Sequence, residues 1–261
     1  MNRGAAREGV AAQDVDSSLR SELRGRMYRE YGKWWSPSLG REMEFLWFGK
    51  FGRPVMLFPT SGGRFFENED FGLTNALADK VDNGEIQLVC VDSVDNESWY
   101  NRYVHPAVRA ARHAQYDSYL RNEMIPYAFN RAQRGDLVVY GASFGAYHAA
   151  NLAARHSDVV SRAVCFSGLY DVHRFLDGYW DDTCYFHCPT AYISNMNGEG
   201  SGRLARVQWV IATGEYDTLV QTNRDFSSLL WAKGVPNHLE IWGGAFGHDW
   251  PWWREHLRRF V

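Results

Sequence analysis

Residues 136–156, DLVVYGASFGAYHAANLAARH, constrain the fold of this chain more than any other stretch. The apolar run 137–140 contains β-branched and aromatic residues without polar alternation, which predicts a buried strand. Gly141-Ala142-Ser143-Phe144-Gly145 follows at once and leads into an alanine-rich segment of helix-forming composition. A strand, then G-x-S-x-G, then a helix predicts a nucleophile elbow, in which a tight turn lifts one serine hydroxyl clear of the backbone.

The two glycines of this turn lack the Cβ atoms that would collide with the strand and the helix. Ser143 would then lie at a helix N-terminus, where free N–H groups and the helix dipole favour negative charge. Acyl transfer to a serine develops such a charge. The alternative is a tight structural turn without chemistry.

Length and composition set the outer limits. A chain of 261 residues with 45% hydrophobic content can bury one sizeable core. We expect a flexible polar arm over 1–22 and one domain over 23–261. The formal net charge of −3 gives no reason to expect nucleic acid or an anionic membrane as partner, and nothing in the sequence indicates the oligomeric state.

No apolar run is long enough to cross a bilayer, and the N-terminus lacks the apolar core of a secretory signal. We therefore expect a soluble, cytoplasmic protein. Four cysteines are few for this length, and Cys90 and Cys165 lie inside strand-like apolar runs, which favours buried free thiols.

Strand-like and helix-like segments alternate along most of the chain. The aromatic stretch 27–52, broken at 36–40, predicts an antiparallel pair of edge strands. Further strands are predicted at 54–59, 86–91, 162–166, 207–212 and 239–242, and helices at 70–81, 106–134 with a break at Pro126, 221–233 and the C-terminus. Such alternation predicts a mostly parallel sheet flanked by helices. Residues 168–206 carry few regular signals, so we expect small helices or functional loops there and no large lid.

Three polar residues follow predicted strands of this sheet: Ser143, Asp217 and His248. Ligands of open parallel sheets bind beyond the carboxyl ends of the strands, so these residues should gather at one edge. A serine hydroxyl needs an imidazole to take its proton, and the imidazole needs a carboxylate to fix its tautomer. The chain order Ser, acid, His is that of α/β-hydrolases, not of chymotrypsin or subtilisin.

Two residues of one loop are candidates for the carboxylate that orients His248: Asp217 and Glu215, which lies two residues earlier. Alternation along the chain does not separate them. Asp92 and Asp171 are further candidates.

Stabilisation of an oxyanion needs two N–H groups aimed at the developing charge. One should belong to Phe144, the residue after the nucleophile. The other should come from the turn Thr60-Ser61-Gly62 after an earlier strand, where we choose Ser61. The alternative is an ordinary strand-to-helix turn.

Three segments resemble the Putative esterase family of α/β-hydrolases: YGASFGAYHAANLAARH, GEYDTLVQTNRDFSSLLWAKGVP and the closing GHDWPWWREHL. That family includes the esterase D and S-formylglutathione hydrolase type, feruloyl esterases, enterochelin esterases and mycolyltransferases. The resemblance runs from Trp34 to the C-terminus and implies Ser143, Asp217 and His248 as catalytic triad, with no cofactor.

The chain also departs from particular members. S-formylglutathione hydrolases usually carry Met and a second Gly around the elbow serine, where this chain has Phe144 and Ala146. Mycolyltransferases are secreted, and no export signal is found here. The resemblance therefore implies acyl-ester chemistry but no particular substrate.

Two other clusters of polar residues could bind a metal or line a pocket. Cys184-x-x-His187-Cys188, with His173 upstream, could be drawn as a zinc site, but the spacing fits no familiar finger and a zinc hydrolase would need no elbow, so we expect no metal. The residues Asp92, Asp95, Glu97, Trp99 and Tyr100 follow a strand and could line a pocket or bind a metal, although a solvated acidic loop is the commoner outcome.

Trp180 and Trp250 are candidates for the substrate pocket, and core packing would explain them equally well. The remaining histidines of the elbow helix, His148 and His156, are expected to be structural or at the surface.

The sequence thus predicts a serine carboxylic-ester hydrolase that cleaves short-chain acyl esters of small molecules through an acyl-serine intermediate. One alternative is an acyltransferase with the same triad. The other is a binding protein that keeps the fold without catalysis, since fold alone does not establish function.

Overall fold

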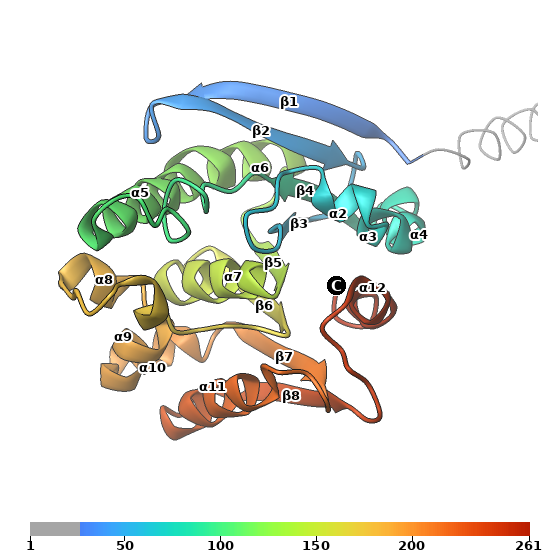
Figure 1. Ribbon diagram of the computed structural model, residues 1–261. Helices are drawn as coiled ribbons and strands as arrows, with labels where there is room; N and C mark the ends of the chain where they lie inside the picture. The colour runs from blue at the N-terminus through green and yellow to red at the C-terminus, as the bar shows by residue number, and fades with distance from the viewer. Residues whose placement is uncertain (1–26) are drawn as a thin grey trace, which may run out of the picture.

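The computed structural model describes residues 27–261, so the predicted arm 1–22 lies outside the described residues. Eight strands form one sheet in the order β1-β2-β4-β3-β5-β6-β7-β8 (Figure 1). The strands are β1 (Arg29–Ser36), β2 (Arg41–Phe48), β3 (Arg53–Leu57), β4 (Ile86–Val91), β5 (Leu137–Ala142), β6 (Val160–Phe166), β7 (Gln208–Gly214) and β8 (Asn237–Trp242). β2 pairs antiparallel with both β1 and β4, and all other neighbours are parallel, as predicted.

Helices cover both faces of the sheet (Figure 1). One core lies under α5 (Pro106–Tyr119), α6 (Ile125–Ala132), α7 (Phe144–Arg155), α9 (Pro189–Asn195) and α11 (Val220–Ala232). The other lies under α3 (Leu73–Ala76), α4 (Ala78–Asp82) and α12 (Trp250–Leu257). Because side chains alternate along a strand, Leu137 and Val139 enter the first core while Val138 and Tyr140 enter the second.

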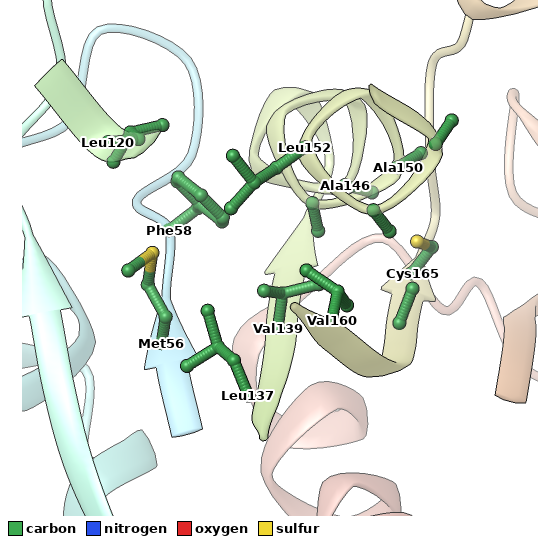
Figure 2. Packing of buried hydrophobic residues seen from close by; sticks show 14 of the residues in the cluster. Met56, Phe58, Leu120, Leu137, Val139, Ala146, Ala150, Leu152, Val160 and Cys165 are labelled. Atoms are coloured by element: carbon green, nitrogen blue, oxygen red, sulfur yellow. The ribbon is translucent and has the colours of Figure 1, made fainter. Parts of the chain in front are cut away.

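The elbow helix α7 lies directly on β5 and β6 (Figure 2). Ala146 and Ala150 are small enough to let its backbone approach Val139 and Cys165, and Leu152 fills the space beside them. Larger side chains at such positions typically cost about 1–3 kcal/mol of stability through overpacking. The alanine-rich composition therefore fixes the helix that begins beside Ser143.

Two predicted helices are not continuous α-helices. The segment predicted as one helix over 70–81 forms α2 (Glu67–Asp70), α3 and α4. Gly72, with a φ of 75°, separates α2 from α3, and Leu77, with φ −107° and ψ 4°, separates α3 from α4. The segment predicted as one helix over 106–134 stays helical through Pro126, the second residue of α6, and a π-helical turn, Leu120–Met124, joins α5 to α6 just before it. Proline removes a backbone donor from the helix interior, and a wider turn accommodates this loss.

Residues 168–206 form small helices, as predicted: a 3₁₀ turn (His173–Phe175), α8 (Asp182–Phe186), α9 and α10 (Glu199–Leu204). All four cysteines are buried and unpaired. Within 27–261, no helix has the length and apolar character that crossing a membrane requires.

Candidate active site

Ser143 occupies the sharp turn between β5 and α7. Its φ of 56° and ψ of −122° are rare for a residue with a side chain, and such backbone strain costs of order 1–3 kcal/mol. The turn depends on the glycines at both sides. A Cβ on Gly141 would lie 2.0 Å from the carbonyl oxygen of Gly145, and a Cβ on Gly145 would lie 2.5 Å from that of Pro59. The predicted elbow geometry is therefore present.

The structure brings Ser143, His248 and Asp217 together from the ends of β5, β8 and β7. His248 Nε2 lies 3.1 Å from Ser143 Oγ. On the other side of the ring, His248 Nδ1 lies 3.1 Å from Asp217 Oδ1 and 3.2 Å from Oδ2. The imidazole thus contacts the hydroxyl through one nitrogen and the carboxylate through the other. This arrangement allows the ring to accept the hydroxyl proton while the carboxylate fixes its orientation.

The other acid candidates have different partners. Glu215 accepts a hydrogen bond from the backbone N–H of Gly244 at 2.9 Å, so it anchors the loop that carries His248. Asp92 pairs with Arg64 at 2.7 Å, and Asp171 lies 2.7 Å from His173 Nδ1. Only Asp217 of these four contacts His248.

Asp217 is buried and its carboxylate accepts two hydrogen bonds besides the contact with His248. Thr213 donates its hydroxyl at 2.7 Å, and Leu219 donates its backbone N–H at 2.8 Å. Burial alone would raise the pKa of Asp217, but the hydrogen bonds from His248, Leu219 and Thr213 outweigh it and hold that pKa below its ordinary value. Asp217 is therefore a carboxylate at neutral pH.

Two side chains hold the loop before His248 by hydrogen bonds to the carbonyl oxygen of Gly247. Ser167 donates its hydroxyl to the carbonyl of Gly247 at 2.8 Å, and Trp253 donates its indole N–H to the same oxygen at 3.1 Å. The Trp253 ring also lies edge-on to the His248 ring, with centroids 5.5 Å apart. Sequence reasoning missed both residues, although Ser167 directly follows β6 and so carried the signal used for the triad.

The turn 60–63 presents one free N–H group. Thr60 donates its N–H to Glu67 at 2.6 Å, Gly62 to Asp95 at 3.1 Å, and Gly63 to the carbonyl of Thr60 at 3.0 Å. Within the described residues the N–H of Ser61 has no such partner. Phe144, the first residue of α7, likewise has no intrahelical acceptor for its N–H. The N–H groups of Ser61 and Phe144 are therefore both available as donors.

Tyr100 contacts both of these residues. Its hydroxyl donates to Ser61 Oγ at 2.8 Å, and its ring lies edge-on to Phe144 with centroids 5.1 Å apart. The Phe175 ring packs against Tyr100 at 5.0 Å. These three aromatic side chains form a wall beside the turn.

The expectation of a solvated acidic loop at 92–100 is wrong. Asp92 and Asp95 are fully buried, and Trp99 is buried with its indole N–H on the hydroxyl of Tyr147 at 3.0 Å. Glu97 is paired with Arg41 and Arg112. The acidic residues find specific partners across the fold, which composition alone does not reveal.

The two predicted pocket tryptophans lie in different places. Trp180 stacks on His173 with ring centroids 4.2 Å apart, within the segment 168–206. Trp250 stacks on Phe71 at 4.6 Å and lies edge-on to Trp253 at 5.1 Å, close to His248 along the chain. Trp250 is thus linked to His248 through Trp253, whose ring contacts both.

Of the residues Cys184, His187, Cys188 and His173 that the sequence suggested as a zinc site, only His173 and Cys188 come together, with Cys188 Sγ 4.0 Å from His173 Nδ1. His187 instead faces Asn151, 3.3 Å away, and the ring of His113. Among residues 27–261, the one trio of potential metal-binding groups is Asp171, His173 and Cys188, with donor atoms within 4.8 Å of one another. Hydrogen bonds to Asp171 from Thr190 and from the backbone N–H of His173 account for this arrangement without an ion.

Comparisons with known proteins identify the family and the fold of the chain. The family described as Putative esterase matches residues 36–260. No curated protein sequence matches the chain. Among solved structures, a ferulic acid esterase is 19% identical with a TM-score of 0.73, covering 90% of this chain and 97% of that chain.

Two further structures are similar over a comparable length. S-formylglutathione hydrolase from Staphylococcus aureus is 19% identical with a TM-score of 0.67, covering 90% of this chain and 94% of that one. MPT51 from Mycobacterium tuberculosis is 19% identical with a TM-score of 0.65, covering 88% and 96%. At this identity the likeness shows the fold, so the predicted α/β-hydrolase fold is confirmed. The family match over most of the chain shows more: the chain belongs to the Putative esterase family.

Proposed function

We propose that this protein is a serine carboxylic-ester hydrolase with Ser143 as nucleophile, His248 as general base and acid, and Asp217 as the orienting carboxylate. One observation carries the proposal: His248 lies between Ser143 Oγ and the buried Asp217 carboxylate, within hydrogen-bond distance of both. The strained elbow turn, which presents Ser143 at a helix N-terminus, supports it.

The reaction would proceed in two halves. His248 Nε2 takes the proton of Ser143 Oγ as the oxygen attacks the ester carbonyl carbon, and the carbonyl oxygen becomes an oxyanion held by the N–H groups of Phe144 and Ser61. The intermediate then collapses and expels the alcohol, which receives the proton from His248. Water repeats the sequence on the acyl-serine and releases the acid. Asp217 stabilises the imidazolium in both halves.

We propose short acyl groups as substrates. The rings of Tyr100, Phe144 and Phe175 form an aromatic wall beside the oxyanion turn, which would limit the length of the acyl group. Residues 168–206 form only short helices of at most seven residues, which favours an open site without a large lid. Trp250 is a further candidate for the pocket through its packing on Trp253, and Trp180 stays a weaker one. We also keep residues 23–261 as one catalytic domain.

The test is hydrolysis of aryl esters with acyl chains of two to twelve carbons by the purified chain and by Ser143→Ala. We expect a preference for about two to six carbons, and a loss on the order of 10⁴-fold or more in kcat for Ser143→Ala. Ser118→Ala, which changes a serine of α5, is the matched control and should act like the wild type. A folded Ser143→Ala protein with near-normal activity would reject the proposal.

Added alcohols separate hydrolysis from transfer. The same acyl-serine can be resolved by water or by an alcohol, so product analysis with and without acceptor alcohols decides between hydrolase and acyltransferase. We expect the free acid as main product. Predominant ester product at millimolar acceptor would assign the protein to acyl transfer and leave the triad intact.

A further inference from the structure

A second aspartate–histidine pair lies behind the candidate active site. His148 Nε2 lies 2.8 Å from Asp95 Oδ1, and their side chains are only 1% and 0% exposed. Burying a carboxylate is costly unless it is paired and fully hydrogen-bonded. The triad does not use this pair, so its presence needs another explanation.

The second oxygen of Asp95 points to an answer, because Oδ2 accepts the backbone N–H of Gly62 at 3.1 Å. Gly62 directly follows Ser61, whose N–H is the free donor of the turn. One carboxylate therefore joins His148 to the oxyanion turn over large separations in sequence: 53 residues from Asp95 to His148 and 33 from Gly62 to Asp95.

His148 belongs to the same helix as the other oxyanion donor. Helix α7 begins at Phe144, and the His148 ring lies edge-on to the Phe144 ring with centroids 5.1 Å apart. The His148 ring also stacks on Phe58, 5.6 Å away, just before the oxyanion turn. Asp95 thus connects the helix that carries one donor to the turn that carries the other.

The backbone of Asp95 extends the same connection to Tyr100. Its carbonyl accepts the N–H groups of Ser98 at 3.1 Å and Tyr100 at 2.9 Å. Tyr100 in turn donates its hydroxyl to Ser61 Oγ. On the far side of the turn, Glu67 accepts the N–H of Thr60. The turn is therefore anchored on both sides of Ser61, with only the Ser61 N–H left unused.

We propose that Asp95, paired with His148, is a positioning residue that sets the Ser61 N–H relative to the Phe144 N–H, so that both reach one oxyanion. This inference rests on the proposed esterase function. Removal of one oxyanion donor from a serine hydrolase typically costs 10²–10³-fold in kcat, because such donors act mainly on the transition state. Loosening a donor rather than removing it should cost less.

Another aspartate–histidine pair, largely buried at the other end of α7, offers a matched control for the substitution of Asp95. Asp117 pairs with His156 at 3.1 Å near the C-terminal end of α7, with side chains 9% and 14% exposed. This pair has the same chemistry and ties α5 to α7, but it makes no contact with residues 60–63 among the described hydrogen bonds. A purely structural role for Asp95 predicts the same consequences for both substitutions.

The first readout is independent of activity: amide hydrogen exchange in the full chain, by NMR or mass spectrometry. In Asp95→Ala we expect exchange of the Gly62 amide to rise at least tenfold relative to wild type, while Asp117→Ala leaves it unchanged. Unchanged Gly62 exchange in a folded Asp95→Ala protein would overturn the proposal.

The second readout is the kinetics of aryl ester hydrolysis. Asp95→Ala should lower kcat about 10- to 100-fold with KM within about twofold of wild type, and Asp117→Ala should leave both nearly unchanged. An equal loss in both variants, or a loss confined to KM, would overturn the positioning role. If Asp95→Ala fails to fold, Asp95→Asn keeps the shape and one acceptor oxygen, and it should still lower kcat at least threefold; wild-type kinetics there would contradict the inference.

These readouts separate the inference from the proposed function. A wild-type protein without Ser143-dependent hydrolysis would reject the esterase proposal, and with it any catalytic role for Asp95, even if Gly62 exchange responds. Normal wild-type hydrolysis with an insensitive Asp95→Ala protein would reject the positioning role alone.

Discussion

The two sides of the candidate active site are built around buried aspartates with opposite tasks. On the side of β7 and β8, Asp217 contacts the imidazole that reaches Ser143. On the side of β3 and β4, Asp95 contacts the buried His148 and accepts the backbone N–H of Gly62. In our proposals the same pair of residue types therefore serves proton transfer in one place and backbone placement in the other.

The two sides also differ in the solvent exposure of their histidine side chains. The His248 side chain is 36% exposed while Asp217 is fully buried, so the ring can meet a substrate with its orientation fixed. Both members of the Asp95–His148 pair are buried, so that pair can act only through what it touches. Exposure of the histidine therefore distinguishes the reacting pair from the supporting one.

The largest expected effect concerns the acid of the reacting pair. Asp217→Asn should lower kcat on the order of 10⁴-fold, because an amide favours the wrong tautomer of His248. Glu215→Gln should cost only a few-fold, since Glu215 contacts Gly244 rather than His248. Steady-state kinetics of both variants measure this ranking. The reverse ranking would move the acid to Glu215.

A smaller effect concerns the stability of the fold, through His187, a buried histidine beside Asn151 of α7. Burial, with a smaller contribution from Arg155, lowers the pKa of His187 to about 4. An unfolded histidine binds its proton with a pKa of about 6.5, so the unfolded state takes up a proton first as the pH falls. The contribution of neutral His187 to the free energy of unfolding should be fully present above pH 6.5 and fall by up to about 3 kcal/mol towards pH 4.

Urea unfolding between pH 4 and pH 7.5 measures this slope. His187→Phe removes the titrating group and should flatten the profile, whatever it does to the stability at neutral pH. A His187→Phe protein with the full wild-type slope would show that His187 is not the source; His113, which is also buried with a lowered pKa, would then be tested in the same way.

Much of this architecture was predictable from the sequence, and the failures have physical causes. The elbow was readable because its strand, glycines and helix are contiguous, and the three triad positions because each follows a strand. Ser61 followed from its place after β3. The Asp95–His148 pair was not predictable, since it depends on how a loop folds back across 53 residues.

Local patterns also misled in two places. Acidic residues at 92–97 suggested a solvated loop, but Asp92 and Asp95 found Arg64, His148 and Gly62 as partners in the folded chain. The segment 70–81 was predicted as one helix, and the backbone angles of Gly72 and Leu77 divide it. Tertiary partners and backbone conformation override such patterns without a signal in composition.

An effect of about tenfold is expected from the support of Asp217. Thr213→Val removes the hydroxyl that donates to Asp217 Oδ2 and keeps the shape of the side chain. The carboxylate would lose one of the bonds that hold its pKa low, so kcat should fall about tenfold and the loss should grow at acidic pH. A pH profile of kcat/KM for Thr213→Val beside wild type measures it. A loss equal at all pH values would contradict this origin.

The smallest expected effect concerns the contact between Tyr100 and Ser61. Tyr100→Phe removes the hydroxyl but keeps the ring on Phe144, so kcat should fall about threefold. Ser61→Ala should cost no more, because the proposed donor is the backbone N–H, which alanine retains. A loss above 100-fold in Ser61→Ala would show that the Ser61 hydroxyl, not its N–H, is needed.

The central claim is that His248 and Asp217 activate Ser143 as a nucleophile, and covalent labelling tests it most directly. The purified chain is incubated with a fluorophosphonate, and the modified residue is located by peptide mass spectrometry. We expect one adduct, on Ser143, formed together with loss of ester hydrolysis and slowed by orders of magnitude in His248→Ala. A stable, folded protein that forms no adduct, or forms it on another residue while hydrolysis continues, would contradict the account.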